Sequence, residues 1–136
     1  MSTAKRKLVW LNRRVAAHGP YLVLCLTEDA YKRVMAHAKV TGYGPWISNT
    51  HSQATTHQLE NPDHGLICCV CVRAWEGRDP VEVAGLLVHE AVHVWQAYAQ
   101  NIGERTPGEE QEAYAIQGIA QELMAEFARQ MAEGVV

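Results

Sequence analysis

The amino-acid sequence predicts an α+β fold, in which a small antiparallel or mixed sheet packs on a central helix and a long C-terminal helix runs antiparallel to it. The first half contains short apolar runs bounded by turn-forming residues, and the second half contains two long segments that start with helix-capping residues. The chain has 136 residues and 48% hydrophobic composition, enough for one buried core. We therefore expect a single domain over residues 1–136.

The first predicted strand covers residues 21–26, which form an apolar run after the turn-forming Gly-Pro pair. Thr27 then offers its side chain as an N-cap, and two acidic residues follow in the first turn, where the helix dipole favours them. A helix is therefore predicted over 28–40. Two glycines and a proline follow and predict a loop.

Two further strands are predicted over 52–59 and 66–73. The segment between them, 60–65, is dense in turn formers and predicts a hairpin. The order of the strands in the sheet stays open at this point.

Three of the four cysteines lie within the apolar run 66–73, which is not the spacing of a disulfide framework and fits a reducing cytoplasm. Alternation along a strand places Cys69 and Cys71 on one face and Cys68 on the other. The Cys69 and Cys71 pair can chelate a metal, or the thiols can be small buried side chains of a sheet core.

Three signals mark the start of a helix over 80–101: Asp79 as N-cap, Pro80 at the first helical position, and Glu82 completing a capping box. Thr106 and Glu109 repeat the capping pattern and predict a last helix over 107–133.

The two ends of the chain differ in charge. Residues 1–40 contain eight Lys or Arg and two acidic residues, whereas residues 101–136 contain seven Glu and two Arg. A basic arm over 1–18 can bind nucleic acid, but we expect a flexible, solvated arm, because the rest of the chain carries no basic field. No apolar run approaches the roughly 20 residues of a membrane span or resembles a secretory signal. We therefore expect a cytoplasmic protein with neither a membrane nor a nucleic-acid partner.

The helix over 80–101 contains His89-Glu-Ala-Val-His93, an H-E-x-x-H motif. Residues four apart on a helix lie about 6 Å from each other on one face, which suits two imidazoles that bind one Zn²⁺, with Glu90 beside them as general base. From the composition, about 0.03 accidental matches are expected. The helix is otherwise apolar, with one polar stripe: Glu82, His89, His93, Gln96 and Gln100. The alternative is that this stripe simply faces water.

A catalytic zinc needs a third protein ligand and one open position. The last helix offers three glutamates in its first turns. Glu110 points away from the apolar stripe of that helix, and Glu109 is the natural capping partner of Thr106. Glu112 lies about 8 Å along the helix, which brings it back toward the histidines. Glu112 is therefore our predicted third ligand.

The segment His89–His93, followed by Glu112-Ala-Tyr-Ala in the next helix, resembles the gluzincin zinc metallopeptidases, whose third ligand is a glutamate in such a segment. The similarity covers roughly residues 66–130 and is greatest to minimal, single-domain gluzincins and to short metallopeptidase-like proteins of bacterial and phage genomes. It implies a zincin-like domain, a Zn²⁺ cofactor, and the strand 66–73 as a sheet edge on which an extended peptide lies.

The sequence departs from the family pattern at two points. Ile116 occupies the position of the acidic residue that orients a zinc histidine, so this orientation must come from elsewhere. The larger C-terminal subdomain, which carries an oxyanion-stabilising His or Tyr, has no counterpart. Substitutes among the remaining residues are Tyr98, Tyr114, Tyr43 and His57, each with an alternative structural role.

The predicted function is that of a zinc-dependent endopeptidase acting on a protein or peptide substrate. His89, His93 and Glu112 bind the metal, and Glu90 is the catalytic base. The competing hypothesis is a non-catalytic, zinc-containing module that binds or regulates another protein.

Overall fold

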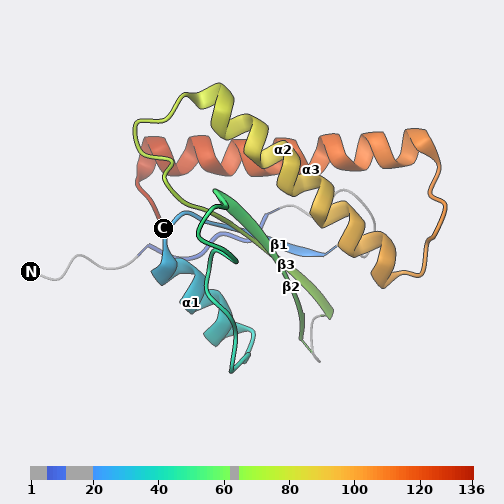
Figure 1. Ribbon diagram of the computed structural model, residues 1–136, viewed down its shortest axis with the longest axis horizontal. Helices are drawn as coiled ribbons and strands as arrows, with labels where there is room; N and C mark the ends of the chain where they lie inside the picture. The colour runs from blue at the N-terminus through green and yellow to red at the C-terminus, as the bar shows by residue number, and fades with distance from the viewer. Residues whose placement is uncertain (1–5, 12–19, 62–64) are drawn as a thin grey trace, which may run out of the picture.

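The computed structural model describes residues 6–11, 20–61 and 65–136. Its elements are, in chain order, β1 (Tyr21–Cys25), α1 (Glu28–His37), β2 (Ala54–Asn61), β3 (Gly65–Val72), α2 (Pro80–Asn101) and α3 (Glu109–Glu133) (Figure 1). The predicted α+β fold with a small mixed sheet is confirmed. None of the described helices is long and apolar enough to cross a membrane.

The three strands pair in the order β1-β3-β2. β1 runs parallel to β3, with Cys25 opposite Cys71, and β2 runs antiparallel to β3, with His57 opposite Cys69. The prediction that 66–73 is a sheet edge is therefore wrong, because β3 is the central strand. Its apolar run from Ile67 to Val72 is buried throughout, as expected for a strand covered on both faces and paired on both sides.

Two apolar clusters lie on opposite faces of this sheet. On one face, α1 contributes Ala30, Tyr31, Val34 and Met35, which share a cluster with Val23, Cys25, Cys69 and Cys71. On the other face, Leu22, Leu24, Cys68, Val70 and Val72 share a cluster with Val83, Leu87, Ala91 and Val94 of α2 and with Ile119 and Leu123 of α3. The expected separation of Cys68 from Cys69 and Cys71 is thus confirmed, and β3 contributes to both clusters.

The helix starts follow the predicted caps in two of three cases. Thr27 accepts a hydrogen bond from the backbone N–H of Ala30, and Asp79 accepts one from Val81. The Glu82 carboxylate accepts from Arg78 instead of completing the capping box predicted with Asp79. The capping box predicted for the last helix is wrong: α3 starts at Glu109 after Gly108, which has no side chain to cap it. Thr106 lies in the preceding loop, where its backbone N–H donates to Glu104.

Element ends differ slightly from the sequence pattern. α1 ends at His37 instead of residue 40, because Lys39 adopts φ of 58°, in which a right-handed helix cannot continue. The predicted turn over 60–65 is shorter, since β2 extends to Asn61 and β3 begins at Gly65, and residues 62–64 lie outside the described part of the chain.

Part of the predicted basic arm belongs to the fold. Within 6–11, the Leu11 N–H donates to the Leu22 carbonyl at 2.9 Å, and Leu8, Val9 and Trp10 are half-buried against the core clusters. Residues 1–5 and 12–18 of the arm lie outside the described residues.

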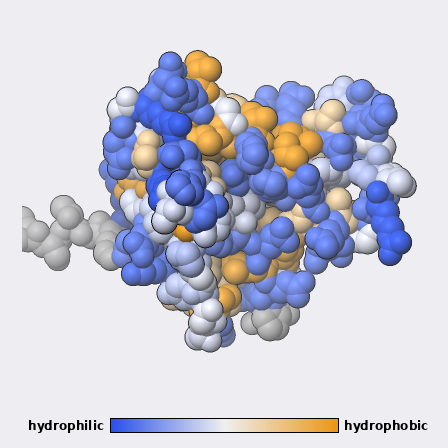
Figure 2. Space-filling view, viewed as in Figure 1, coloured by the Kyte–Doolittle hydropathy of each residue, from blue (hydrophilic) through white to orange (hydrophobic). Residues whose placement is uncertain are grey.

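The C-terminal half forms a helical hairpin in which α3 runs back across α2 (Figure 1). The face of the molecule seen in that orientation is largely hydrophilic, with apolar side chains in separate patches (Figure 2).

Candidate functional site

His89 and His93 lie one turn apart on the solvent-exposed side of α2. Their Nε2 atoms are 3.3 Å apart, and their ring centroids are separated by 4.9 Å. Two nitrogens that bind a tetrahedral Zn²⁺ at about 2.0–2.1 Å lie about 3.3–3.4 Å from each other. The imidazole pair therefore has the nitrogen separation of a zinc site.

Gln96 orients one of these two rings. The Nδ1 atom of His93 lies 3.0 Å from the Gln96 side-chain oxygen, which can only accept a hydrogen bond. With that oxygen as acceptor, Nδ1 carries the proton, and the lone pair of Nε2 faces the Nε2 atom of His89. Gln96 therefore holds the ring of His93 in one orientation. The sequence placed Gln96 on the polar stripe but gave no sign of this role.

Glu90 points the other way, toward the sheet. It is 4% exposed, and its Oε2 accepts a short hydrogen bond from the Thr56 hydroxyl on β2. The same hydroxyl lies 3.5 Å from the Glu90 backbone carbonyl. The partnership joins residues 34 positions apart, so no local sequence signal indicates it.

Glu112 lies on α3 against α2, where its Oε2 accepts a hydrogen bond of 2.7 Å from the Trp95 indole. It lines a surface pocket of about 570 Å³ together with Trp95 and Gln96. In the described part of the chain, His89, His93 and Glu112 do not form a three-ligand group within 4.8 Å. The pocket places Glu112 close to Gln96, and its assignment as the third ligand stays a prediction.

The other predicted oxyanion donors are dispersed. Tyr98 is buried and packs on Trp95, whereas Tyr114 and Tyr43 are 69% and 41% exposed. The Nε2 atom of His57 donates to the Trp46 carbonyl at 2.8 Å, and the ring packs on Tyr31. Because Tyr31 belongs to the α1 side of the sheet, His57 lies on the face opposite α2. His57 therefore cannot act at the histidine pair.

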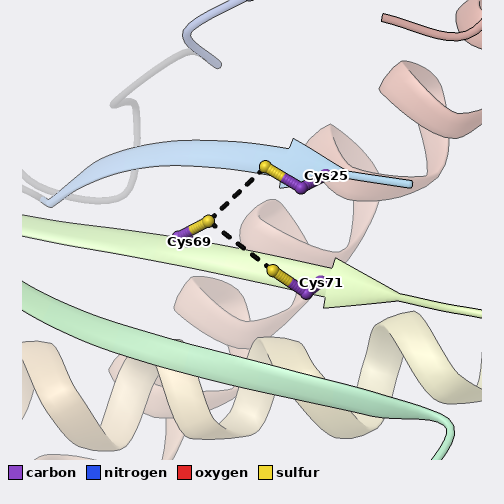
Figure 3. Close-up of side chains that lie close together, drawn as sticks. All are labelled: Cys25, Cys69 and Cys71. Carbon is purple, nitrogen blue, oxygen red and sulfur yellow. Dashed lines mark hydrogen bonds between the residues drawn. The ribbon is translucent and has the colours of Figure 1, made fainter. Parts of the chain in front are cut away.

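A second group of ligand atoms lies on that opposite face (Figure 3). The Sγ atom of Cys69 is 3.5 Å from that of Cys25 and 3.8 Å from that of Cys71. All three side chains have 0% exposure. This cluster has the geometry to hold a metal ion, and it is the one such three-ligand group among the described residues.

The three thiols titrate together. Hydrogen bonds from Cys69 and Cys71 lower the pKa of Cys25 to about 5. The bond to Cys25 raises the pKa of Cys69, and burial raises that of Cys71. These hydrogen bonds therefore favour the charged form at Cys25 over the other two thiols. The sequence showed the Cys69 and Cys71 pair, but Cys25 joins it only through the pairing of β1 with β3.

Comparisons with protein-family models, with curated proteins and with solved structures give no match to this chain.

Proposed function

We propose that the protein is a zinc-dependent endopeptidase of the gluzincin type. The observation that carries the proposal is the separation of 3.3 Å between the Nε2 atoms of His89 and His93 on an exposed helix face. Gln96 supports it by directing the proton of His93 to the nitrogen that faces away from the metal. Two neutral imidazoles held in this way are ligands that suit zinc.

In this proposal His89, His93 and Glu112 hold the ion, and Glu112 exchanges its hydrogen bond with Trp95 for the metal. Bound zinc supplies a Lewis acid and a water of lowered pKa. The chain supplies the proton acceptor: Glu90 follows His89 directly, and Thr56 holds its Oε2. Glu90 points toward the sheet, so acting as the base requires it to exchange its bond with Thr56 for the zinc-bound water.

The proposed substrate is an extended segment of a protein or peptide. Within the described chain β2 pairs with β3 alone, so one edge of β2 is available for another strand. Thr56 of β2 contacts Glu90, the neighbour of His89 in the sequence, and this contact supports the use of the β2 edge. A peptide added to β2 is held by main-chain hydrogen bonds and needs little sequence preference. β2 thus takes the role that the resemblance to gluzincins implied for the strand 66–73.

The test compares wild type with Glu90→Gln and His93→Ala, each loaded with zinc and incubated with a proteome-derived peptide library. We expect one zinc per chain in wild type and in Glu90→Gln, with new peptide termini, detected by mass spectrometry, from wild type alone. His93→Ala should lose both metal and cleavage. Glu109→Ala, an exposed glutamate at the start of α3, is the control that should keep both. No wild-type cleavage with zinc bound, or zinc loss in Glu90→Gln but not in Glu112→Ala, contradicts the assignment.

The second candidate is a non-catalytic, zinc-containing module that binds another protein. The observation that favours it is that both carboxylates already have partners, Thr56 for Glu90 and Trp95 for Glu112. A hydroxamate inhibitor separates the two functions. Metal-dependent binding of the hydroxamate indicates an exchangeable ligand position and supports the enzyme, whereas a protein partner bound equally well by Glu90→Gln and by metal-free protein supports the module.

A further inference from the structure

We propose that Cys25, Cys69 and Cys71 form a second metal site, specific for a soft monovalent cation, Cu(I), bound by three sulfur atoms. The site lies between the sheet and α1, on the face opposite the histidine pair, and shares no residue with the proposed zinc site. It neither rests on the proposed peptidase activity nor contributes to it.

The positions of the sulfur atoms favour one shared ion. Three sulfurs placed around an ion at a bond length of about 2.3 Å are separated by about 3.8–4.0 Å, depending on whether the ion is tetrahedral or planar. The two measured separations are 3.5 and 3.8 Å, and all three ligand atoms lie within 4.8 Å of one another. Ordinary repacking of these side chains is enough to accommodate an ion.

The register of the sheet produces this arrangement. Cys25 lies opposite Cys71 in the parallel pair, and Cys69 lies two residues before Cys71 on the same face of β3. All three thiols therefore lie on two adjacent, hydrogen-bonded strands, β1 and β3 (Figure 3). The strands hold the thiols in place before any ion binds.

Coordination number selects the cation. Structural zinc sites have four protein ligands, and catalytic ones have three ligands and a water. The thiols here have 0% exposure, and no fourth His, Cys, Asp or Glu ligand joins them among the described residues. A closed site with three sulfur ligands suits a soft cation of low coordination number, and thiolates select Cu(I) among such cations.

The surroundings of the cluster can offset part of the charge that a bound site carries. Thiols lose their protons when they bind metal, so a bound cation leaves net negative charge in the interior. Arg33 of α1 lies close enough to Cys25 to offset part of this charge. The Met35 side chain, fully buried in the same cluster, provides a polarisable neighbour.

The experiment refolds the full chain anaerobically with Cu(I), supplied as its acetonitrile complex. The histidine pair is removed by combining His89→Ala and His93→Ala, because imidazole also binds copper. After desalting we expect one copper per chain, and X-ray absorption at the copper edge should show a shell of three sulfurs without nitrogen. A parallel refolding with Zn²⁺ should leave no zinc on the desalted chain.

The matched control variants are Cys69→Ala and Cys68→Ala, which remove neighbouring buried thiols on opposite faces of β3. Competition with bicinchoninic acid should show a loss of Cu(I) affinity of more than about 100-fold for Cys69→Ala, since even losing a group that only supports a ligand costs about 10–100-fold. Cys68→Ala should bind as the parent does. Failure of the refolded parent to retain copper, a copper shell containing nitrogen, equal losses in the two variants, or retention of zinc overturns the proposal.

Discussion

The hydrogen bond between His93 and Gln96 gives a test of how the histidine pair is prepared for metal. In Gln96→Leu, the Nδ1 proton of His93 has no acceptor, so the ring orientation and tautomer are no longer held. We expect zinc affinity to fall by about 10–100-fold in a chelator competition. Thermal stability should change little, because Gln96 is exposed. Gln100→Leu, an exposed glutamine one turn further along α2, is the control, and an equal loss there would contradict the role of Gln96.

Because the Cys68 thiol is buried, we expect the free energy of unfolding to fall at alkaline pH. Burial raises the pKa of this thiol from 9.0 to about 12, so the folded state favours the neutral thiol. Its contribution to stability is complete below pH 9 and is lost as the pH rises toward 12, because only the unfolded chain then releases the proton. The free energy of unfolding should fall by about 1.4 kcal/mol per pH unit for this group.

Guanidinium unfolding under reducing conditions at pH 8 and pH 11 measures this loss. Tyr31 titrates in the same window, because burial raises its pKa to about 12, so the comparison is between wild type and Cys68→Ala. The variant should lose less stability over this pH interval than wild type. Equal losses would show that the Cys68 thiol is not responsible.

At the level of single residues, the sequence predicted contacts that are local and missed those that are not. The spacing of His89 and His93 on one helix predicted their proximity, and alternation predicted which face each cysteine of β3 takes. Thr56 and Cys25 were missed because each reaches its partner through strand pairing or packing between distant segments.

The start of α3 offers a stabilising substitution. Gly108 occupies the N-cap without a side-chain hydrogen bond, in an extended conformation with φ of −61°. A Cβ placed there would meet only the Gln111 Cβ at 4.0 Å, an ordinary contact. Gly108→Ser should therefore add a cap and restrict the unfolded chain, raising the free energy of unfolding by about 0.5–1 kcal/mol. Thr106→Ala, expected to be neutral in the same urea titration, is the control. A clear loss of stability in Thr106→Ala would show that Thr106 caps α3, as the sequence predicts.

Among the elements, the sequence predicted best where capping and periodicity agree. α2 has the predicted bounds of 80–101, because Asp79 and Pro80 mark its start and its apolar pattern is unbroken. The position of β3 in the sheet was missed, although its continuous apolar run is the pattern of a strand buried on both faces.

The contact between Thr56 and Glu90 joins the sheet to the helical layer. Thr56→Val keeps the shape of the side chain but removes the donor to a carboxylate that is 4% exposed. Leaving this group without a partner should cost about 1–3 kcal/mol in the free energy of unfolding. Thr55→Val is the control on the other face of β2, where Thr55 bonds the exposed Ser48. If guanidinium unfolding shows the same loss in free energy of unfolding for both variants, the bond to Glu90 stabilises the fold no more than the bond to Ser48 does.

Parallel pairing of β1 with β3 also affects how the chain folds during synthesis. β2 and β3 form a local hairpin, but the β1 residue Cys25 meets Cys69 across 44 positions. Closing so long a loop is slow, and it cannot begin until β3 has been made. At about 5–20 residues per second, the apolar β1 segment leaves the ribosome about 2–9 s before its partner. During that interval β1 is an unpaired strand, open to aggregation or to capture by a chaperone.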